Sequence, residues 1–311
     1  MFRGQLTPER YVIYARAALW SLTIIIFTGA AVRLTGSGLG CSDWPQCEQD
    51  QFVASLEYHA LIEFGNRLFT GVVAIAVMLA VLGSLRRVPK RNDLIWWSLG
   101  LVAGVIGQIV LGALLVQTEL DPRFTMGHFL LSMVLLWNAV VLIERARDDD
   151  LGPRQSSPMA TAAAAVFAVG SILLLTGTIV TGSGPHAGSD DPETAARLPF
   201  LIHEVTRIHS VTAFTVLGGV WFTIRYSTKL GRYDVRQQAM RVFSMLIAQT
   251  ALGYWQYFTG VPELLVFLHI MFASFTWIQI VKLAWMAQRS PVAATTSGAV
   301  PKQHDRTAHN S

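Results

Sequence analysis

The sequence predicts an all-α membrane protein with eight transmembrane helices in two pseudo-symmetric four-helix bundles and both termini in the cytoplasm. Three observations predict this fold. First, 52% of the 311 residues are hydrophobic and only 14% are charged, whereas soluble domains carry about 25% charged residues. Second, the apolar residues fall into eight long runs. Third, the second half of the chain repeats landmarks of the first half.

Each apolar run approaches the roughly 20 residues that a helix needs to cross a bilayer. The first run lacks a small-residue cleavage site and is long enough to remain as an anchor, so we expect no cleavable signal peptide. The expected spans are residues 15–35, 63–84, 95–116, 126–143, 160–180, 202–224, 239–258 and 264–286.

The basic residues are distributed as the positive-inside rule requires of a membrane protein whose two ends are cytoplasmic. The formal net charge of +4 therefore reflects membrane orientation, and we expect no nucleic-acid partner. Of the 24 Lys and Arg residues, the only ones outside the segments expected on the cytoplasmic side are Arg33, Arg67, Arg123, Arg197 and Arg207.

An internal repeat divides the chain into an N-terminal bundle (1–143), a charged linker (144–158), a C-terminal bundle (159–286) and a tail (287–311) expected to be disordered. Each half has Thr-Gly-Ser-Gly after its first run, at 35–38 and 181–184. In each third run a Gln precedes a Gly by four residues (Gln108 and Gln249), and in each fourth run a His precedes a Trp by eight or nine (His128 and His269). Small residues shared for close helix packing alone are the alternative explanation. An even number of helices per half makes the repeats parallel.

Two histidines of the second half lie at matched depth. His269 follows the helix-breaking Pro262, and His209 follows Pro199 at a similar distance, which places each about 10 Å into its helix. Two imidazoles on facing helices fit axial ligation of one heme iron, whereas zinc needs three or four ligands. A hydrogen bond to a neighbouring helix is the plainer alternative, and His203, on a different face, competes with His209 as the ligand.

The first half has different chemistry at the equivalent place. Glu63, Asn66 and Arg67 share one helix face by their spacing. Asn66 precedes His128 by 62 residues and His209 precedes His269 by 60, so Asn66 stands where the second half has a histidine. The sequence predicts one strong iron ligand here, His128, beside a carboxylate and a guanidinium. The alternative is a Glu63–Arg67 ion pair that only neutralises two buried charges.

Polar residues near the expected outer face add two further features. Arg33, Arg67 and Arg207 lie near the outer ends of their helices and would suit heme propionates, or would only snorkel to the interface. Cys41 and Cys47 share the first external loop with five residues between them. In an oxidising compartment they can close a disulfide, either as a staple for the loop or as a redox pair.

On these residues the chain resembles the heme A synthase family of bacteria and mitochondria. The resemblance covers roughly residues 15–286, and it is carried by residues 35–41 with Asp43-Trp44-Pro45 and Cys47, by 63–67, Gly127-His128 and His209, and by Gly184-Pro185-His186-Ala187-Gly188.

The resemblance implies oxidation of the C8 methyl of heme O to a formyl group, giving heme A, by two successive hydroxylations through a geminal diol. It implies substrate heme in the first half, with His128 at its iron, heme b in the second half, and Glu63 as the catalytic residue. It also matches Cys41 and Cys47 to the family's external cysteine pair. Many members have histidine where this chain has Asn66, so a bis-histidine substrate site is not implied.

The implied location is the bacterial cell membrane, with the lipid bilayer, heme O synthase, terminal oxidase assembly factors and an unidentified electron donor as partners. A membrane b-type cytochrome in quinone or ferric electron transfer would need two histidines in both halves, which Asn66 disfavours. A transporter or non-catalytic assembly factor would also carry polar residues in its spans, but here they cluster toward one face.

Overall fold

The computed structural model describes residues 5–47, 53–148, 154, 156–189 and 196–289. These residues form eight α-helices, and the only β-bridges within them are two isolated ones. The all-α prediction is confirmed, and each expected span coincides with one helix. The helices are α1 (Pro8–Leu34), α2 (Tyr58–Arg86), α3 (Asn92–Gln117), α4 (Pro122–Arg147), α5 (Pro158–Ser183), α6 (Ile202–Lys229), α7 (Tyr233–Phe258) and α8 (Glu263–Ala287).

Seven helices begin before the predicted apolar runs, and in three of them, α1, α4 and α5, a side-chain cap precedes the first turn. Asp121 accepts a hydrogen bond from the backbone N–H of Arg123 at 2.8 Å, and Ser157 accepts one from Ala160 at 3.1 Å. A proline follows each of these caps at the first helical position, where its missing N–H costs nothing. Apolar length alone therefore underestimates these helices.

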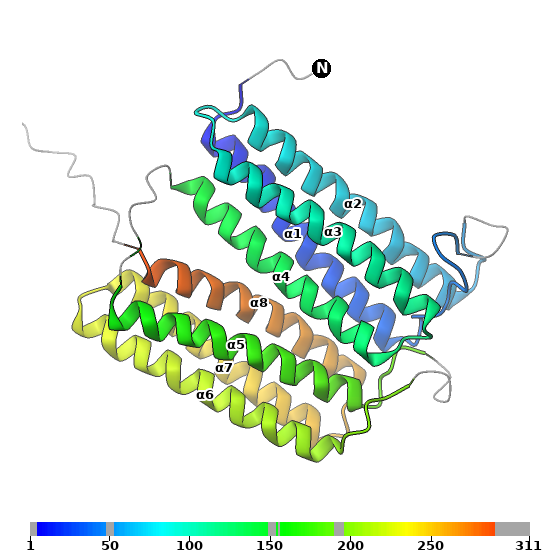
Figure 1. The fold of residues 1–311 in the computed structure, drawn as a ribbon. Coiled ribbons are helices and arrows are strands. Elements are labelled where there is room, and N and C mark those ends of the chain that lie inside the picture. The colour runs from blue at the N-terminus through cyan, green and yellow to red at the C-terminus, as the bar shows by residue number, and fades with distance from the viewer. Residues whose placement is uncertain (1–4, 48–52, 149–153, 155, 190–195, 290–311) are drawn as a thin grey trace, which may run out of the picture.

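The helices pack as two equivalent groups of four (Figure 1). In the first group α1 contacts α2 and α4, and α3 contacts α2 and α4; α5–α8 repeat the same four contacts. Between the groups α4 contacts α8 and α5, and α8 contacts α1. Exchanging the two halves leaves this contact pattern unchanged, as expected for a duplicated unit with α4 and α8 nearest the pseudo-symmetry axis.

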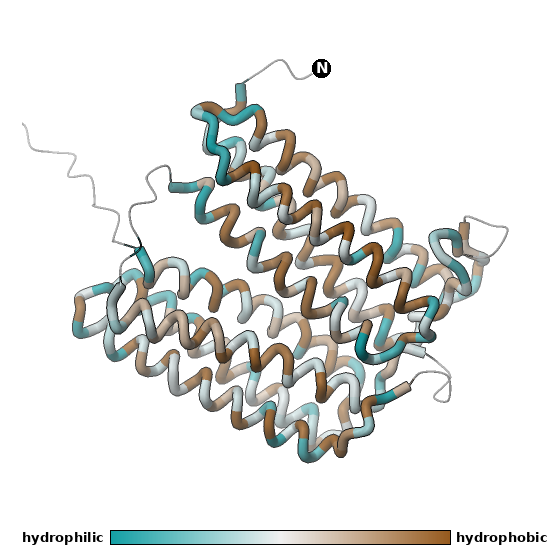
Figure 2. Tube along the Cα trace, in the orientation of Figure 1, coloured by the Kyte–Doolittle hydropathy of each residue, from teal (hydrophilic) through white to brown (hydrophobic). Residues whose placement is uncertain are grey.

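Six helices of the described chain, α1–α5 and α8, are long and apolar enough to cross a membrane. The other two, α6 and α7, are 28 and 26 residues long, about 40 Å at 1.5 Å per residue, but they carry more polar side chains. Figure 2 shows hydrophilic residues gathered mainly at the two ends of the bundles. The protein is therefore a multi-pass membrane protein, with six spans supported by length and composition.

The two halves are joined in the bundle interior and at one end. In the interior, the indole N–H of Trp277 on α8 donates to the carbonyl of Met133 on α4 at 2.8 Å. At the end that carries the Cys41–Cys47 loop, Gly38 N–H donates to the carbonyl of Gly188 at 2.9 Å. A Cβ on Gly38 would lie 2.8 Å from that carbonyl oxygen, so only glycine permits the approach.

Two sequence predictions concern connecting segments. The linker is shorter than predicted, because α4 continues to Arg147 before α5 begins at Pro158. A membrane span ends where charged residues begin, but the helix itself can continue through those residues. The tail predicted over 287–311 begins at the last residue of α8, and residues 290–311 lie outside the described part of the chain.

Candidate functional site

A cavity of about 470 Å³ lies within the two bundles and is lined by residues from all eight helices. Its volume is in the range typical of small-molecule and cofactor sites. The cavity brings together most of the predicted site residues and adds several polar side chains. The polar and ionisable residues that line it include Arg33, Glu63, Asn66, Arg67, Gln108, His128, His186, His209, Gln249 and His269.

The four candidate positions for heme binding lie at similar depth. Asn66 and His209 are on α2 and α6, and His128 and His269 are on α4 and α8, all in the second or third turn of their helices. In each half these helices are diagonal members of the bundle, each contacting the two helices between them. Side chains from diagonal helices meet across a bundle interior, which is where cofactors bind in such folds.

In the second half, hydrogen bonding prepares His209 as a ligand. The Thr176 hydroxyl donates to the Leu173 carbonyl at 3.0 Å, and His209 Nδ1 lies 3.1 Å from the same hydroxyl oxygen. With the hydroxyl hydrogen donated to the Leu173 carbonyl, the tautomer of His209 that satisfies both contacts carries its proton on Nδ1 and donates it to the hydroxyl oxygen. The proton is thereby held on Nδ1, which leaves the lone pair of Nε2 for a metal.

His269 is held differently. The side-chain amide of Gln249 donates to the His269 backbone carbonyl at 2.9 Å, whereas the imidazole makes no hydrogen bond within the described residues, and its Nδ1 is buried. Glycines pack against both rings: a Cβ on Gly177 or on Gly253 would lie 3.0 Å from Cε1 of His209 or His269. Packing thus holds both rings, together with the Thr176 contact for His209.

The first half repeats this arrangement with one substitution. The Gln108 side-chain amide donates to the His128 carbonyl at 3.1 Å, and the His128 imidazole makes no hydrogen bond within the described chain. On the facing helix α2, Oδ1 of Asn66 accepts a hydrogen bond from the Thr28 hydroxyl of α1 at 2.7 Å. This Thr–Asn contact occupies the place of the Thr176–His209 contact, which supports the equivalence inferred from spacing.

The imidazoles of His128, His209 and His269 suit an iron that a porphyrin already holds and that needs only one or two further ligands from the protein. The described residues contain no group of three or more His, Cys, Asp or Glu side chains that could hold a bare ion. Buried imidazoles without a protein partner are uncommon because an unsatisfied polar group is costly. Heme, which needs one or two axial donors, fits His128 in one half and His209 with His269 in the other.

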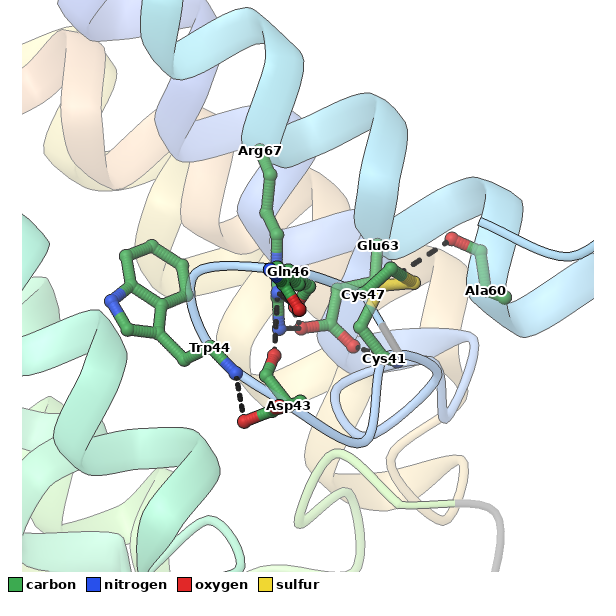
Figure 3. The surroundings of a disulfide bond; sticks show 8 residues. All are labelled: Cys41, Asp43, Trp44, Gln46, Cys47, Ala60, Glu63 and Arg67. Carbon is green, nitrogen blue, oxygen red and sulfur yellow. Dashed lines mark hydrogen bonds and ion pairs between the residues drawn. A yellow bond between two sulfur atoms is a disulfide. The ribbon is translucent and has the colours of Figure 1, made fainter. Parts of the chain in front are cut away.

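Glu63 and Arg67 form the predicted ion pair, and both also hold the disulfide loop (Figure 3). Glu63 Oε1 accepts from Arg67 Nη2 at 2.6 Å and from Nε at 3.1 Å, while Oε2 accepts from the backbone N–H of Cys41 at 2.8 Å. Arg67 Nη1 donates to the carbonyls of Asp43 and Gln46, each at 2.8 Å. The Arg67 guanidinium carbon also lies 4.9 Å from the Trp44 ring centroid. The loop is thus fastened over the end of α2.

The Cys41–Cys47 disulfide closes this loop, and both residues are completely buried. They pack with Ala54, Ala60 and the partly buried Phe64. Gly40 lets the loop approach the start of α2, because a Cβ there would lie 2.3 Å from the His59 carbonyl oxygen. The disulfide itself does not line the cavity, whereas Trp44, Glu63 and Arg67 do.

Of the remaining predicted site residues, Arg33 lines the cavity, whereas Arg207 and His203 do not. The Nε of Arg33 donates to the His186 carbonyl at 2.8 Å and its Nη2 to the Thr181 carbonyl at 3.1 Å. Those hydrogen bonds tie α1 to the second half. Arg207 and His203 are exposed on a face of α6 that does not line the cavity, so the placement favours His209 over His203.

Sequence reasoning missed the polar residues that position the others. Thr28, Thr176 and the backbone-directed roles of Gln108 and Gln249 were not predicted. A signal existed: Thr-Gly occurs at 28–29 and at 176–177, in the equivalent helices. His186 also lines the cavity, and its Nε2 lies 2.7 Å from the Val261 carbonyl oxygen.

Comparison with known proteins agrees with this arrangement. The family model of the COX15-CtaA cytochrome oxidase assembly proteins matches residues 12–281. The chain belongs to this family. A COX15-CtaA relative, the heme A synthase of Bacillus cereus (strain AH187), is 24% identical over 298 residues, which cover 91% of this chain and 94% of the relative.

Two other COX15-CtaA relatives match over a shorter region. The heme A synthase of Geobacillus thermodenitrificans is 30% identical over 106 residues, 34% of this chain and 33% of the relative. That of Geobacillus kaustophilus is 31% identical over 106 residues, again 34% of this chain and 33% of the relative. In these two alignments the chain spans about a third of the relatives' length.

The disulfide leads to a first prediction about this family member. In native membranes Cys41 and Cys47 should resist thiol-alkylating reagents and become labelled only after a reductant is added, because both sulfurs are bonded to each other and buried. Mass spectrometry of the alkylated loop peptide measures this. Ready labelling of both cysteines without reductant would contradict it.

Proposed function

We propose that this protein is a heme A synthase of the bacterial cell membrane, converting heme O to heme A. The observation that carries the proposal is the shared cavity of Glu63, Asn66 and His128: one imidazole and one carboxylate line the same cavity of about 470 Å³. The family match and the heme A synthase relatives support it. In our proposal all eight helices span the membrane and both termini are cytoplasmic.

The proposed division of labour follows the repeat. The first half, residues 1–143, binds heme O as substrate through His128, and the second half, residues 159–286, binds heme b through His209 and His269. Heme b, when bound, supplies one-electron redox chemistry. Gln108 and Gln249 brace the helix backbone at His128 and His269, so the two imidazoles are held in equivalent positions.

Glu63 is the proposed catalytic group. The C8 methyl of heme O is oxidised in two hydroxylations to a geminal diol, which loses water to give the formyl group of heme A. In each hydroxylation dioxygen, two electrons from the donor and two protons convert a C–H bond to C–OH and release one water, and positive character develops at the substrate carbon. A carboxylate beside that carbon can accept a proton or stabilise the charge. Arg67 orients Glu63 through two hydrogen bonds to one oxygen.

The disulfide loop has a proposed role in the same chemistry. It contributes Trp44 to the cavity wall and holds Glu63 Oε2 through Cys41 N–H. A loop fastened at this end would restrict water around the reacting methyl group, where solvent would weaken charge stabilisation. Arg33 would contribute by joining the two halves through its two hydrogen bonds to backbone carbonyls, and the remaining N–H groups of its guanidinium could donate to a heme propionate.

The proposal is tested by identifying the hemes extracted from the purified protein. Heme B together with heme O or heme A is the expected result. Heme B alone would contradict the synthase and favour a b-type cytochrome, and no heme at all would favour a transporter. Chromatography of the acid–acetone extract with mass detection distinguishes the three hemes, because heme A and heme O carry a long isoprenoid side chain that heme B lacks.

A further inference from the structure

The two halves use the same polar framework but differ at one position of the cavity. Gln108 and Gln249 donate to the carbonyls of the histidines 20 residues further along the chain. Thr28 and Thr176 each contact the facing position on the next helix. That facing position is His209 in the second half and Asn66 in the first. The Gln and Thr contacts are therefore the same in both halves, and only the residue at the facing position differs.

The hydrogen bond from Thr28 restricts what Asn66 can do. The amide oxygen is the only atom of this side chain with a lone pair suited to iron. The Thr28 hydroxyl donates to that oxygen at 2.7 Å, closer than its 3.2 Å approach to the Ile25 carbonyl. The amide nitrogen, which can only donate, is left for the cavity that Asn66 lines. Asn66 is thereby equipped as a hydrogen-bond donor rather than as a ligand.

Gly29 and Gly177 follow the two threonines at equivalent positions, and the space beside them differs between the two halves. A Cβ on Gly177 would lie 3.0 Å from the His209 ring, so the imidazole fills that site. A Cβ on Gly29, its counterpart after Thr28, would meet no described atom within 4 Å beyond its own helix. Gly29 also lines the cavity. The volume taken by an imidazole in the second half is therefore open beside Asn66.

We propose that the first-half site binds heme iron through His128 alone and keeps the opposite axial position open for a small uncharged diatomic ligand. The amide N–H of Asn66 donates a hydrogen bond to that ligand, and Gly29 provides the room beside it. The second-half site, with His209 and His269, is closed to such ligands. This inference rests on the proposed function only in assuming that heme binds at His128.

Carbon monoxide is the probe, applied to the reduced, full-length protein loaded with both hemes. Reduced wild-type protein should bind one carbon monoxide per two hemes, and the oxidised protein should show one high-spin and one low-spin ferric signal in electron paramagnetic resonance. Asn66→His should abolish carbon monoxide binding and convert the high-spin signal to low spin without loss of heme. The matched change in the other half, His209→Asn, should do the reverse and raise binding to two per two hemes.

Gly29→Val tests the space without altering any proposed ligand. We expect carbon monoxide affinity to fall about tenfold or more, because the valine side chain would occupy the open space beside Gly29 in which the ligand binds, while heme content and spin state stay unchanged. Its counterpart, Gly177→Val, should instead displace His209 and alter the low-spin signal.

The outcomes separate this inference from the proposed function. Two hemes with only low-spin signals and no carbon monoxide binding in the wild type would overturn the open position and leave the proposed function standing. Unchanged binding in Asn66→His would also overturn it. If no bound heme depends on His128, as shown by an unchanged heme content in His128→Ala, the proposed substrate site fails and the inference fails with it.

Discussion

Replacing Glu63 by Gln is expected to lower heme A formation by about 10²–10⁴-fold, the range typical of a general acid–base group, while heme b content stays unchanged. Glutamine keeps the size of glutamate and can still accept from Cys41 N–H through its oxygen, but it removes the negative charge. Heme O or its hydroxymethyl intermediate should accumulate on the protein. Heme A formed and heme b per protein are measured together.

The structural alternative for Glu63 predicts a different result. If the carboxylate only neutralised Arg67, its loss would destabilise the fold and lower both heme contents together. Arg67 would, however, keep its hydrogen bonds to the carbonyls of Asp43 and Gln46, so the loop retains two of its fastenings. Glu119→Gln is the matched control, because Glu119 is exposed and lies outside the cavity. Near-normal turnover in fully heme-loaded Glu63→Gln protein would end the catalytic proposal.

Loss of either second-half histidine should remove the low-spin signal of heme b. His209→Ala and His269→Ala are each expected to abolish the low-spin b-type absorption, because the heme iron would lose one of its two histidine ligands and with it the six-coordinate low-spin state. The first half should be affected less, since His128 and its framework belong to the other bundle. Difference spectra of purified, membrane-inserted protein measure the effect.

His203→Ala is the matched control for these variants. His203 lies on the same helix as His209 but is exposed on a face away from the cavity, so this variant should keep its full b-type spectrum. A complete low-spin spectrum in both His209→Ala and His269→Ala would remove the heme b assignment. Loss of the spectrum in His203→Ala alone would make His203 the ligand.

Much of the fold could be predicted because bilayer thickness and helix geometry act on local sequence. A run of about 20 apolar residues has few ways to satisfy its backbone polar groups in lipid except as a helix. The same geometry separates His203 from His209: six residues along a helix correspond to about 600°, which turns the two side chains to different faces. The exposure of His203 agrees with that expectation.

The candidate site could be predicted less completely. Spacing paired Glu63 with Arg67 and set Asn66 opposite His128, because both inferences use helix periodicity and the repeat. It did not reveal that Arg33 donates to carbonyls of the second half, 148 and 153 residues away. Backbone carbonyls are present at every residue and leave no mark in the sequence.

The sequence alone therefore determined the helices, their duplication and the residue types facing the interior, since each follows from periodicity and from the cost of burying polar groups. Only the tertiary structure decided what those residues contact. Thr28 on α1 engages the Asn66 oxygen on α2, and the space beside Gly29 is open where that beside Gly177 is filled. These contacts depend on how closely two helices approach and on side-chain volume, and neither quantity is encoded by any local pattern.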